Sequence, residues 1–516
     1  IFFLFLINVV GTNLHSDPTE GIILYSSREG AIPVTNLIDS LGTIWHNWEH
    51  SFGSVSGPQI VDDSTLLYQY RVQNPTMIAG GEGGGMQLIS WNGDILKEVI
   101  LSNDSLQHHH DALWLTDNTF LVLAWERKTS EEAFAAGRKA IENPLNQMWS
   151  EAILEIAPIY PDSFEVVWAW YLWDHLIQDA DSSLPNYGQI SLHPERMDIN
   201  YGTVGAVNAP GGSNADWLHF NSLDYDSTRD LILISSRNSN EIFIIDHSTT
   251  TEQAADSVGG FYGKGGDFLY RWGNPQAYKA GDSLDQKLFW NHEANWIPNN
   301  YPDSGKVIIF NNGYQRIGPD FTSIEILEIP ENFIITETGT FGPEEFFTTV
   351  NLDDSLFTTR LGGAFQLPNG HILASISMLN KIIQFSLDGE IVWQHEVNGN
   401  LTIARKYFHF EYPTLSTQNQ YNNEYPTLES SGNYPNPFNY QTEIRFNTSE
   451  QRAAFITIYD PAGRIIKKIE QKIGVGKRFF QWNGENELGN PVSSGLYIYR
   501  IQVGKSVRIG KMIFLK

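Results

Sequence analysis

Three histidines occupy equivalent places in three copies of one repeated sequence pattern. His110, His219 and His292 each lead a short apolar segment, which is followed by a polar turn and then by a stronger apolar run. If the copies are arranged around an axis, equivalent positions face that axis and the three imidazoles converge on one pocket. Neutral imidazole can serve as a nucleophile, as a general acid or base, or as a ligand of zinc. The spacing therefore predicts a site for one of these chemistries, built from distant segments.

Polar residues near the histidines extend this candidate site. Arg237 lies on the strand predicted to follow the His219 strand, so its guanidinium can reach the same end of the pocket. Its planar set of N–H donors suits an oxyanion. Asn221 lies two residues after His219, on the same side of a strand, where it can donate a further hydrogen bond. Asp111 and Asp216 are expected to orient their neighbouring histidines.

The segments that must position these residues read as β-strands. In residues 17–410, short runs of Val, Ile, Leu, Phe, Tyr and Trp are separated by Gly, Asn, Asp and Pro. Asn92-Gly93 is one of several typical two-residue hairpin turns. Meandering strands repeated in this way predict a β-propeller. One stretch, residues 130–143, has a helical pattern with Ser130 as its N-cap.

The composition excludes several other kinds of site. The 516-residue chain has 60 acidic and 33 basic residues, and its net charge of −27 argues against nucleic acid as a partner, because phosphate neutralisation needs a basic face. It contains no cysteine, which excludes disulfides, thiolate catalysis and cysteine-ligated metals. The run from Lys264 to Gly266 lies between β segments, so it does not read as a phosphate-binding loop before a helix.

Both ends of the chain read as segments outside the propeller. Residues 1–16 open with about ten apolar residues, too few to span a bilayer, and are expected to be a truncated secretory signal peptide. No other segment approaches the length of a membrane span. Residues 411–432 are polar and are expected to form a linker. Residues 433–516, with short strands and sharp turns, are predicted to form a small β-sandwich.

Several short motifs cover this C-terminal module in order. They are Asn433 to Asn439, Ile458 to Asp460 with Gly463-Arg464, Trp482 to Gly484, Ser494 to Tyr497 and Lys511-Met512. Together they resemble the C-terminal sorting domain of the type IX secretion system. The resemblance implies a bacterium of the Bacteroidota or a relative, export across the outer membrane by the type IX machinery, and a secreted or cell-surface location. A generic immunoglobulin-like adhesion module is the alternative.

Seven motifs likewise occur in order along the body of the chain. They are His109 to Asp111, Asp216 to Ser222, Ser236-Arg237, Lys264 to Pro275, Asn291 to Glu293, Phe310 to Gly313 and Leu367 to Gly370. This series resembles the arylsulfotransferase family, which uses an aryl sulfate and not a nucleotide sulfate as donor. The resemblance implies an all-β chain with a six-bladed propeller before the sandwich. It also implies transfer of a sulfuryl group from an aryl sulfate to a phenolic acceptor, without a cofactor.

The resemblance also implies a role for each candidate residue. His292 matches the family's nucleophile, which implies a transient sulfohistidine there, and neutral imidazole is both a nucleophile and a good leaving group. Arg237 would stabilise the negative charge on the sulfuryl oxygens. His110 and His219 would contact the sulfuryl group, and His219 would act as acid and base on the phenol. The candidate substrate-binding residues are Asn221, Asn291 and His109.

Departures from the family pattern and three rival functions stay open. Asn291 and Glu293 flank His292 where the family has Gln and Asp, so each side chain differs in reach by one methylene. Three imidazoles can bind zinc, but the charge of Arg237 in the same pocket disfavours a second cation, and no metal site is predicted. The propeller could also bind sulfated or phenolic ligands without reaction. It could hydrolyse aryl sulfates, because hydrolysis and transfer share the sulfohistidine step.

Overall fold

The computed structural model of the protein resolves two units. It describes residues 21–62, 64–115, 118–159, 163–207, 212–333, 335–337, 339–408, 429–448, 453–460, 464–474, 476–503 and 506–516. The predicted signal peptide, residues 1–16, and residues 411–428 of the predicted linker lie outside these ranges. The chain divides into two compact units, Ile1–Thr414 and Leu415–Lys516.

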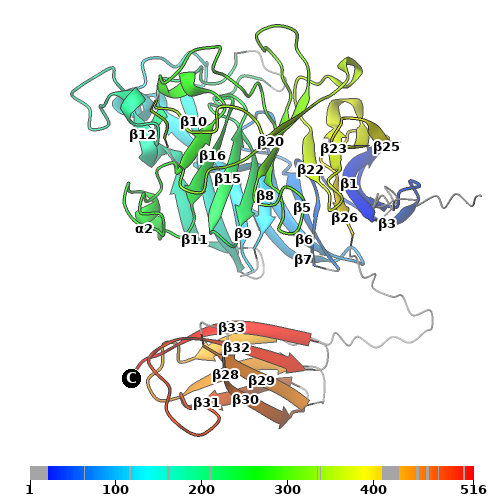
Figure 1. The fold of residues 1–516 in the computed structure, drawn as a ribbon, viewed down its shortest axis with the longest axis vertical. Coiled ribbons are helices and arrows are strands. Elements are labelled where there is room, and N and C mark those ends of the chain that lie inside the picture. The colour runs from blue at the N-terminus through cyan, green and yellow to red at the C-terminus, as the bar shows by residue number, and fades with distance from the viewer. Residues whose placement is uncertain are drawn as a thin grey trace, which may run out of the picture. The chain divides into compact units, whose positions relative to one another are not determined.

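Within the described ranges, the first unit contains six four-stranded antiparallel sheets (Figure 1). The first blade has strands β1 Ile22–Glu29, β2 Ile32–Ile38, β3 Ile44–Glu49 and β26 Arg405–Tyr407, the second has β4 Gln59–Asp62, β5 Thr65–Arg71, β6 Gly84–Ser90 and β7 Ile95–Ile100, and the third has β8 Leu106–Trp114, β9 Phe120–Thr129, β10 Gln147–Ile159 and β11 Ser163–Tyr171. The fourth blade has β14 Phe220–Asp226, β15 Leu231–Ser236, β16 Glu241–Asp246 and β17 Tyr270–Trp272, the fifth has β18 Ala294–Trp296, β19 Val307–Asn311, β20 Ser323–Leu327 and β21 Thr348–Asn351, and the sixth has β22 Gly363–Gln366, β23 Ile372–Ile376, β24 Lys381–Phe385 and β25 Ile391–Glu396. The predicted six-bladed β-propeller is confirmed.

The first blade joins the two ends of the propeller. Strand β26, from the end of the unit, pairs with β1, and Leu24 lies opposite Arg405 in the antiparallel register. Figure 1 shows β26 and β1 side by side. Because this pairing takes up the free edge of β1, the ring of blades is closed by backbone hydrogen bonds.

The first strands of neighbouring blades lie next to one another. Strand β14 contacts both β8 and β18, and β18 contacts β22. These are the first strands of the third to sixth blades. This arrangement brings together the three positions at which the histidine-bearing copies enter their blades.

Helices contribute little to the first unit. Helix α1 spans Ser130–Ala135, which is shorter than the predicted 130–143. Its N-cap is Thr129 and not Ser130: the Thr129 hydroxyl accepts from the Glu132 N–H, and the Glu132 carboxylate accepts from the Thr129 N–H. The helix ends where Gly137 adopts a left-handed φ of 95°.

The remaining short elements lie in connections between strands. They are α2 Thr251–Ala254, the parallel pair β12 Leu176–Ile177 and β13 Met197–Asp198, and 3₁₀ turns at Leu172–His175, Ile190–Leu192, Pro275–Tyr278, Asp354–Leu356 and Ser377–Leu379. In the part of the chain that the structure describes, no helix is long and apolar enough to cross a membrane.

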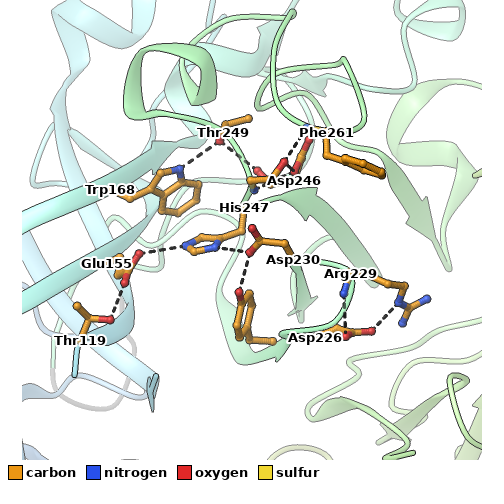
Figure 2. A network of polar contacts seen from close by, with 12 residues as sticks. Thr119, Glu155, Trp168, Asp226, Arg229, Asp230, Asp246, His247, Thr249 and Phe261 are labelled. Atoms are coloured by element: carbon orange, nitrogen blue, oxygen red, sulfur yellow. Dashed lines mark hydrogen bonds and ion pairs between the residues drawn. The ribbon is translucent and has the colours of Figure 1, made fainter. Parts of the chain in front are cut away.

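A polar network joins the third blade to the fourth. His247, directly after β16, lies between two carboxylates (Figure 2). Its Nδ1 is 2.7 Å from Asp230 in the β14–β15 turn, and its Nε2 is 3.3 Å from Glu155 on β10. Trp168 of β11 donates to the Thr249 hydroxyl at 3.1 Å in the same region. These contacts fix adjacent blades against each other.

The second unit is a two-sheet β-sandwich, as predicted. One sheet has the order β27-β28-β31 and the other β30-β29-β32-β33. The strands are β27 Glu429–Tyr434, β28 Thr442–Thr448, β29 Ala453–Tyr459, β30 Ile465–Lys472, β31 Gly476–Trp482, β32 Gly495–Val503 and β33 Ser506–Phe514. Trp482, Phe438 and Tyr499 belong to its buried core. Strand β27 begins inside the segment predicted as linker, because Glu429 to Ser430 already pair with β28.

Candidate active site

The structure brings His110, His219 and His292 together. The ring centroids of His110 and His219 are 4.5 Å apart, and those of His110 and His292 are 6.3 Å apart. All three are nearly buried, with exposed fractions of 6%, 8% and 6%. Segments separated by 109 and 73 residues in sequence therefore supply one compact imidazole cluster, as the repeat pattern predicts.

Unusual backbone conformations aim these side chains. His110 and His219 have φ values of 51° and 56°, in the left-handed region that non-glycine residues rarely adopt. In β8 and β14 the strand register shifts at these positions. Gly81 accepts the close approach of His110, because a Cβ there would lie 2.1 Å from the imidazole ring. The bulged entries to these two blades thus turn His110 and His219 out of the pleat and toward the cluster.

His219 is oriented by a buried carboxylate. Its Nδ1 is 2.5 Å from Oδ2 of Asp216. Burial alone would raise the pKa of Asp216, but the nearby His219, His109 and Arg237 outweigh it and lower the pKa. Asp216 is therefore ionised and accepts the Nδ1 proton, which leaves the lone pair on Nε2 of His219. The predicted orienting role of Asp216 agrees with this geometry.

Asp111 does not orient a histidine, contrary to expectation. Its carboxylate accepts from the Ser56 hydroxyl at 3.0 Å and from the backbone N–H groups of Ala112 and Leu223 at 3.1 and 3.2 Å. These three contacts direct the carboxylate of Asp111 away from the imidazole of His110. Asp111 ties the third blade to the fourth instead.

His110 is held by another histidine. Its Nδ1 lies 2.9 Å from Nδ1 of His109, whose Nε2 lies 3.0 Å from Oε2 of Glu151 on β10. Both His109 and Glu151 are fully buried, and His109 stacks on Trp125 at 4.3 Å. Its two ring nitrogens are therefore occupied by protein groups. The structure places His109 behind His110, where it lines no cavity at the histidines. This position does not agree with the substrate contact that the sequence predicts for His109.

His292 is kept in its neutral form. Burial lowers its pKa to about 3, and the neighbouring His219 and Arg237 act in the same direction. Its buried Nδ1 has no hydrogen-bond partner among the described residues. Burial also lowers the pKa of His110 well below its ordinary value, with His219 and His109 adding to the effect. At neutral pH both rings are uncharged.

Arg237 supplies the positive charge of the site. Its guanidinium stacks on Trp290, with Cζ 3.7 Å from the ring centroid. Burial lowers the pKa of Arg237 to about 10, so it remains charged at neutral pH. Its buried Nε has no hydrogen-bond partner within the described part of the chain. The stacked guanidinium thus presents a desolvated donor in a fixed position.

The two candidate asparagines lie at different depths. Asn221 lines the cavity and donates from Nδ2 to the backbone carbonyl of Asn291 at 2.9 Å. Asn291 is fully buried, and its Nδ2 donates to the Ser235 hydroxyl at 2.8 Å and to the Glu241 carbonyl at 3.1 Å. Asn291 therefore anchors the segment before His292 to the fourth blade, while its buried Oδ1 has no hydrogen-bond partner among the described residues.

Two cavities meet at the histidines. The first, of about 810 Å³, is lined by His110, Asn221 and His292, and also by Arg28, Arg71 and Arg360. The second, of about 920 Å³, is lined by His110, His219, His292 and Arg237, together with Tyr201, Trp217 and Trp290. The imidazoles thus lie where an arginine-lined space joins an aromatic one. An aryl sulfate has both chemical characters.

The sequence analysis missed several of these residues. Arg360 lines both cavities but lies in a segment without a recognised pattern. Trp290 supports Arg237, a role that nothing in its sequence neighbourhood indicates. Glu151 has only a weak signal, because it is one of two acidic residues, with Glu155, in the largely apolar strand β10. Among the residues that the structure describes, no group of three His, Cys, Asp or Glu side chains could hold a metal ion.

Comparison with known proteins identifies the family. The model described as Arylsulfotransferase (ASST) matches residues 33–324, more than half of the chain. This range contains the three histidines and Arg237. The chain belongs to the arylsulfotransferase family. The FlgD Ig-like domain model matches residues 436–506, within the sandwich.

Solved structures similar to this arylsulfotransferase are distant in sequence. A protein of unknown function from Bacteroides caccae is 11% identical, covers 74% of this chain and 98% of its own, and has a TM-score of 0.40. Truncated FlgD from Helicobacter pylori is 20% identical, covers 17% of this chain and 68% of its own, and has a TM-score of 0.13. No curated protein shows significant similarity to the chain.

Proposed function

We propose that the propeller moves a sulfuryl group from an aryl sulfate to a phenol through a sulfohistidine at His292. One observation carries the proposal: three buried imidazoles and a desolvated guanidinium line one cavity in a member of the arylsulfotransferase family. Nδ1 of His292 and Nε of Arg237 are polar, buried and without partners in the described protein. Such groups are costly to bury unless a ligand completes their hydrogen bonds.

In the first step, a ring nitrogen of His292 attacks the sulfur of the donor. The N–S bond forms while the bond between sulfur and the phenolic oxygen breaks, and the phenolate leaves with the electron pair. Negative charge is spread over the sulfuryl oxygens as this happens. Arg237 and His110 are in position to donate hydrogen bonds to these oxygens, which stabilises the transition state in a site that excludes water.

In the second step, an acceptor phenol takes the place of the product. Nε2 of His219, free because Nδ1 is bound to Asp216, accepts the proton of the phenolic hydroxyl. The phenolic oxygen attacks sulfur, the N–S bond breaks, and the electron pair returns to His292. Neutral imidazole is regenerated at His292, and His219 returns its proton to the released phenolate or to solvent, so the enzyme is ready for another donor.

Steady-state kinetics with the full-length protein test this function. A chromogenic aryl sulfate is supplied as donor, with and without added phenol, to the wild type and to His292→Ala. Phenol-dependent turnover with parallel double-reciprocal plots, lost in the variant, is expected for a ping-pong transferase. Turnover that does not depend on phenol would identify an aryl sulfate hydrolase. Ligand binding without turnover would identify a binding propeller.

We also propose that the protein is exported and displayed or released outside the outer membrane by a type IX secretion system. The support is the ordered series of motifs from Asn433 to Met512 on a module with an immunoglobulin-like fold. In a bacterium that carries this system, the full chain should reach the cell surface or the medium. A chain lacking residues 433–516 should remain in the periplasm, and equal export of both chains would contradict the proposal.

A further inference from the structure

A buried carboxyl group is hydrogen-bonded to His109, which in turn contacts His110. Glu151, on β10, is fully buried, and both of its oxygens are engaged. Oε1 accepts from the backbone N–H of Phe220 at 3.0 Å, and Oε2 lies 3.0 Å from Nε2 of His109. Nδ1 of His109 in turn lies 2.9 Å from Nδ1 of His110. A continuous hydrogen-bonded chain therefore runs from Glu151 to a histidine that lines both cavities.

The position of one proton fixes every donor in this chain. If Glu151 is ionised, it accepts from Nε2–H of His109. Nδ1 of His109 then accepts from Nδ1–H of His110, and Nε2 of His110 has a lone pair. If Glu151 is protonated on Oε2, it donates to Nε2 of His109. Nδ1–H of His109 then donates to Nδ1 of His110, and the remaining ring proton of His110 is on Nε2.

The surroundings of Glu151 favour the protonated arrangement. Strand β9 faces it with Trp125, β8 with His109, and the segment leading into β14 with Asp216 and His219. The backbone N–H groups of Phe220 and His219 and the charge of His219 favour the ionised form of Glu151, but they are outweighed. Burial, reinforced by the charge of Asp216, raises the pKa of Glu151 well above its ordinary value. Burial also lowers the pKa of His109 to about 3, so this ring does not take the proton as a cation.

We propose that Glu151 is a positioning residue that holds its proton and fixes His110 as a hydrogen-bond donor, with Nε2–H directed to the sulfuryl oxygens. Asp216 does the opposite for His219, whose Nε2 is left as an acceptor. Two carboxyl groups in different protonation states thus give adjacent histidines complementary tautomers. The catalytic consequence rests on the proposed function, whereas the tautomer itself is a property of the resting protein.

The proposal predicts how pH changes the site. When Glu151 loses its proton at alkaline pH, each proton in the chain shifts and Nε2 of His110 becomes an acceptor. A lone pair then faces the negatively charged sulfuryl oxygens, and the rate of donor cleavage falls. The Gln side chain in Glu151→Gln donates from Nε2 and accepts at Oε1, so it copies the protonated carboxyl and cannot ionise.

The tautomers can be read directly in the full-length protein. The probe is ¹⁵N chemical shifts of selectively ¹⁵N-histidine-labelled protein, with the His110 signals assigned from their loss in His110→Gln. At pH 7 we expect wild type and Glu151→Gln to have the same His110 tautomer, protonated on Nε2. On raising the pH, only the wild type should convert to the Nδ1–H form.

Kinetics give the second readout. Glu151→Gln should retain the pH 7 donor cleavage rate within about fivefold, because one neutral donor replaces another, and its alkaline loss of activity should disappear. Glu151→Ala should lose about 10² to 10³-fold, the usual effect of removing one transition-state donor. The matched control is Glu155→Gln on the same strand, which should keep the wild-type pH profile of activity.

Two results would overturn the assignment. A His110 protonated on Nδ1 in the wild type at pH 7 means that Glu151 works as a carboxylate. Activity in Glu151→Gln as low as in Glu151→Ala means the same. If Glu151→Ala does not fold, the Gln variant and the spectra still decide. If the wild type turns over no aryl sulfate, the proposed function fails, but the spectra alone still confirm or refute the tautomer.

Discussion

A histidine that attacks sulfur must be unprotonated at the moment of attack, and burial ensures this for His292. The ring lies beside His219 and Arg237, which further disfavour a positive charge on it. The same desolvation strengthens the hydrogen bonds that Arg237 can make with a sulfuryl group. Burial and neighbouring positive charges make the imidazoles of His292 and His110 weak bases. The role of each ring therefore depends on which of its nitrogens carries the proton.

The low pKa of His292 gives a pH prediction. The pre-steady-state burst of phenol released by the donor should keep its rate between pH 8 and pH 5. His292, with a pKa of about 3, stays neutral throughout this range. An ordinary imidazole with a pKa near 6.5 would be mostly protonated at pH 5 and would react about 30-fold more slowly. Quench-flow at both pH values, in wild type, checks this, and a 30-fold fall would show that His292 titrates normally.

Asp216 provides a separate test of the acceptor half-reaction. In Asp216→Asn, the amide can present its N–H to the ring and favour the wrong tautomer of His219. We expect transfer to phenol to slow by about 10² to 10⁴-fold, as when the orienting carboxylate of a catalytic histidine is removed. The burst of donor cleavage should fall much less when the donor carries a good leaving group, because such a phenolate can leave without a proton from His219. Equal loss in both half-reactions with this donor would contradict the acid and base role of His219.

Part of this site can be predicted from the sequence, and the residues that cannot be predicted escape for physical reasons. Repetition reveals His110, His219 and His292, because equivalent positions of a ring meet. It does not reveal the role of His109, because its hydrogen bond to Glu151 comes from a strand that is distant in sequence. Glu151 escapes because its importance depends on partners from β8 and β14, which only the folded chain brings to β10.

At the scale of elements, each blade acts as a support for the residue at its inner end. Hairpin turns such as Asn92-Gly93 and alternating apolar runs are local signals, so the sheets could be predicted from the sequence. The pairing of β26 with β1 joins residues almost 400 positions apart and has no local signal. The helix at residue 130 was predicted too long, because Gly137 takes a left-handed conformation and ends it after one and a half turns.

The network around His247 in Figure 2 predicts a pH-dependent contact between blades. Burial alone would lower the pKa of His247, but Asp230 and Glu155 outweigh it and raise it to about 9. Its contribution to stability is therefore fully present below pH 6.5 and is lost as the pH rises through about 9. His247→Gln should reduce the free energy of unfolding by about 2 kcal/mol at pH 6 and by much less at pH 10.

Urea unfolding of wild type and variant at the two pH values measures this difference. The control is His193→Gln, because His193 pairs with Glu195 while 47% of its side chain is exposed. An exposed pair of this kind contributes little at any pH. An effect of His247→Gln that stayed the same at pH 6 and pH 10 would mean that the ring acts by packing and not as a cation.

For the whole molecule, the charge of the surface and the charge of the site have opposite signs. The chain carries −27 overall, yet Arg28, Arg71 and Arg360 line one cavity at the histidines and Arg237 lines the other. Arg71 is paired with Glu82 of the same cavity at 3.0 Å, so Arg28, Arg360 and Arg237 contribute most of the positive field that an anionic donor meets within a Debye length. A net negative charge of the chain is therefore compatible with capture of a sulfate ester.

Salt dependence tests this division of charge. We expect kcat/KM for an aryl sulfate to fall by about threefold or more between 10 and 200 mM salt, because screening weakens the attraction. Arg360→Gln should lower kcat/KM at low salt and flatten the dependence, with kcat little changed. A rise of kcat/KM with salt in the wild type would mean that the net negative charge of the whole chain dominates the approach of the donor.

The most direct test of the account is the covalent intermediate at His292. Full-length protein is mixed with aryl sulfate alone, quenched under mildly alkaline conditions and digested for peptide mapping by mass spectrometry. The account predicts one sulfuryl adduct, located on His292, absent from His292→Ala and removed by a chase of phenol with formation of the new aryl sulfate. Donor cleavage with no adduct, or with an adduct on another residue, would contradict it.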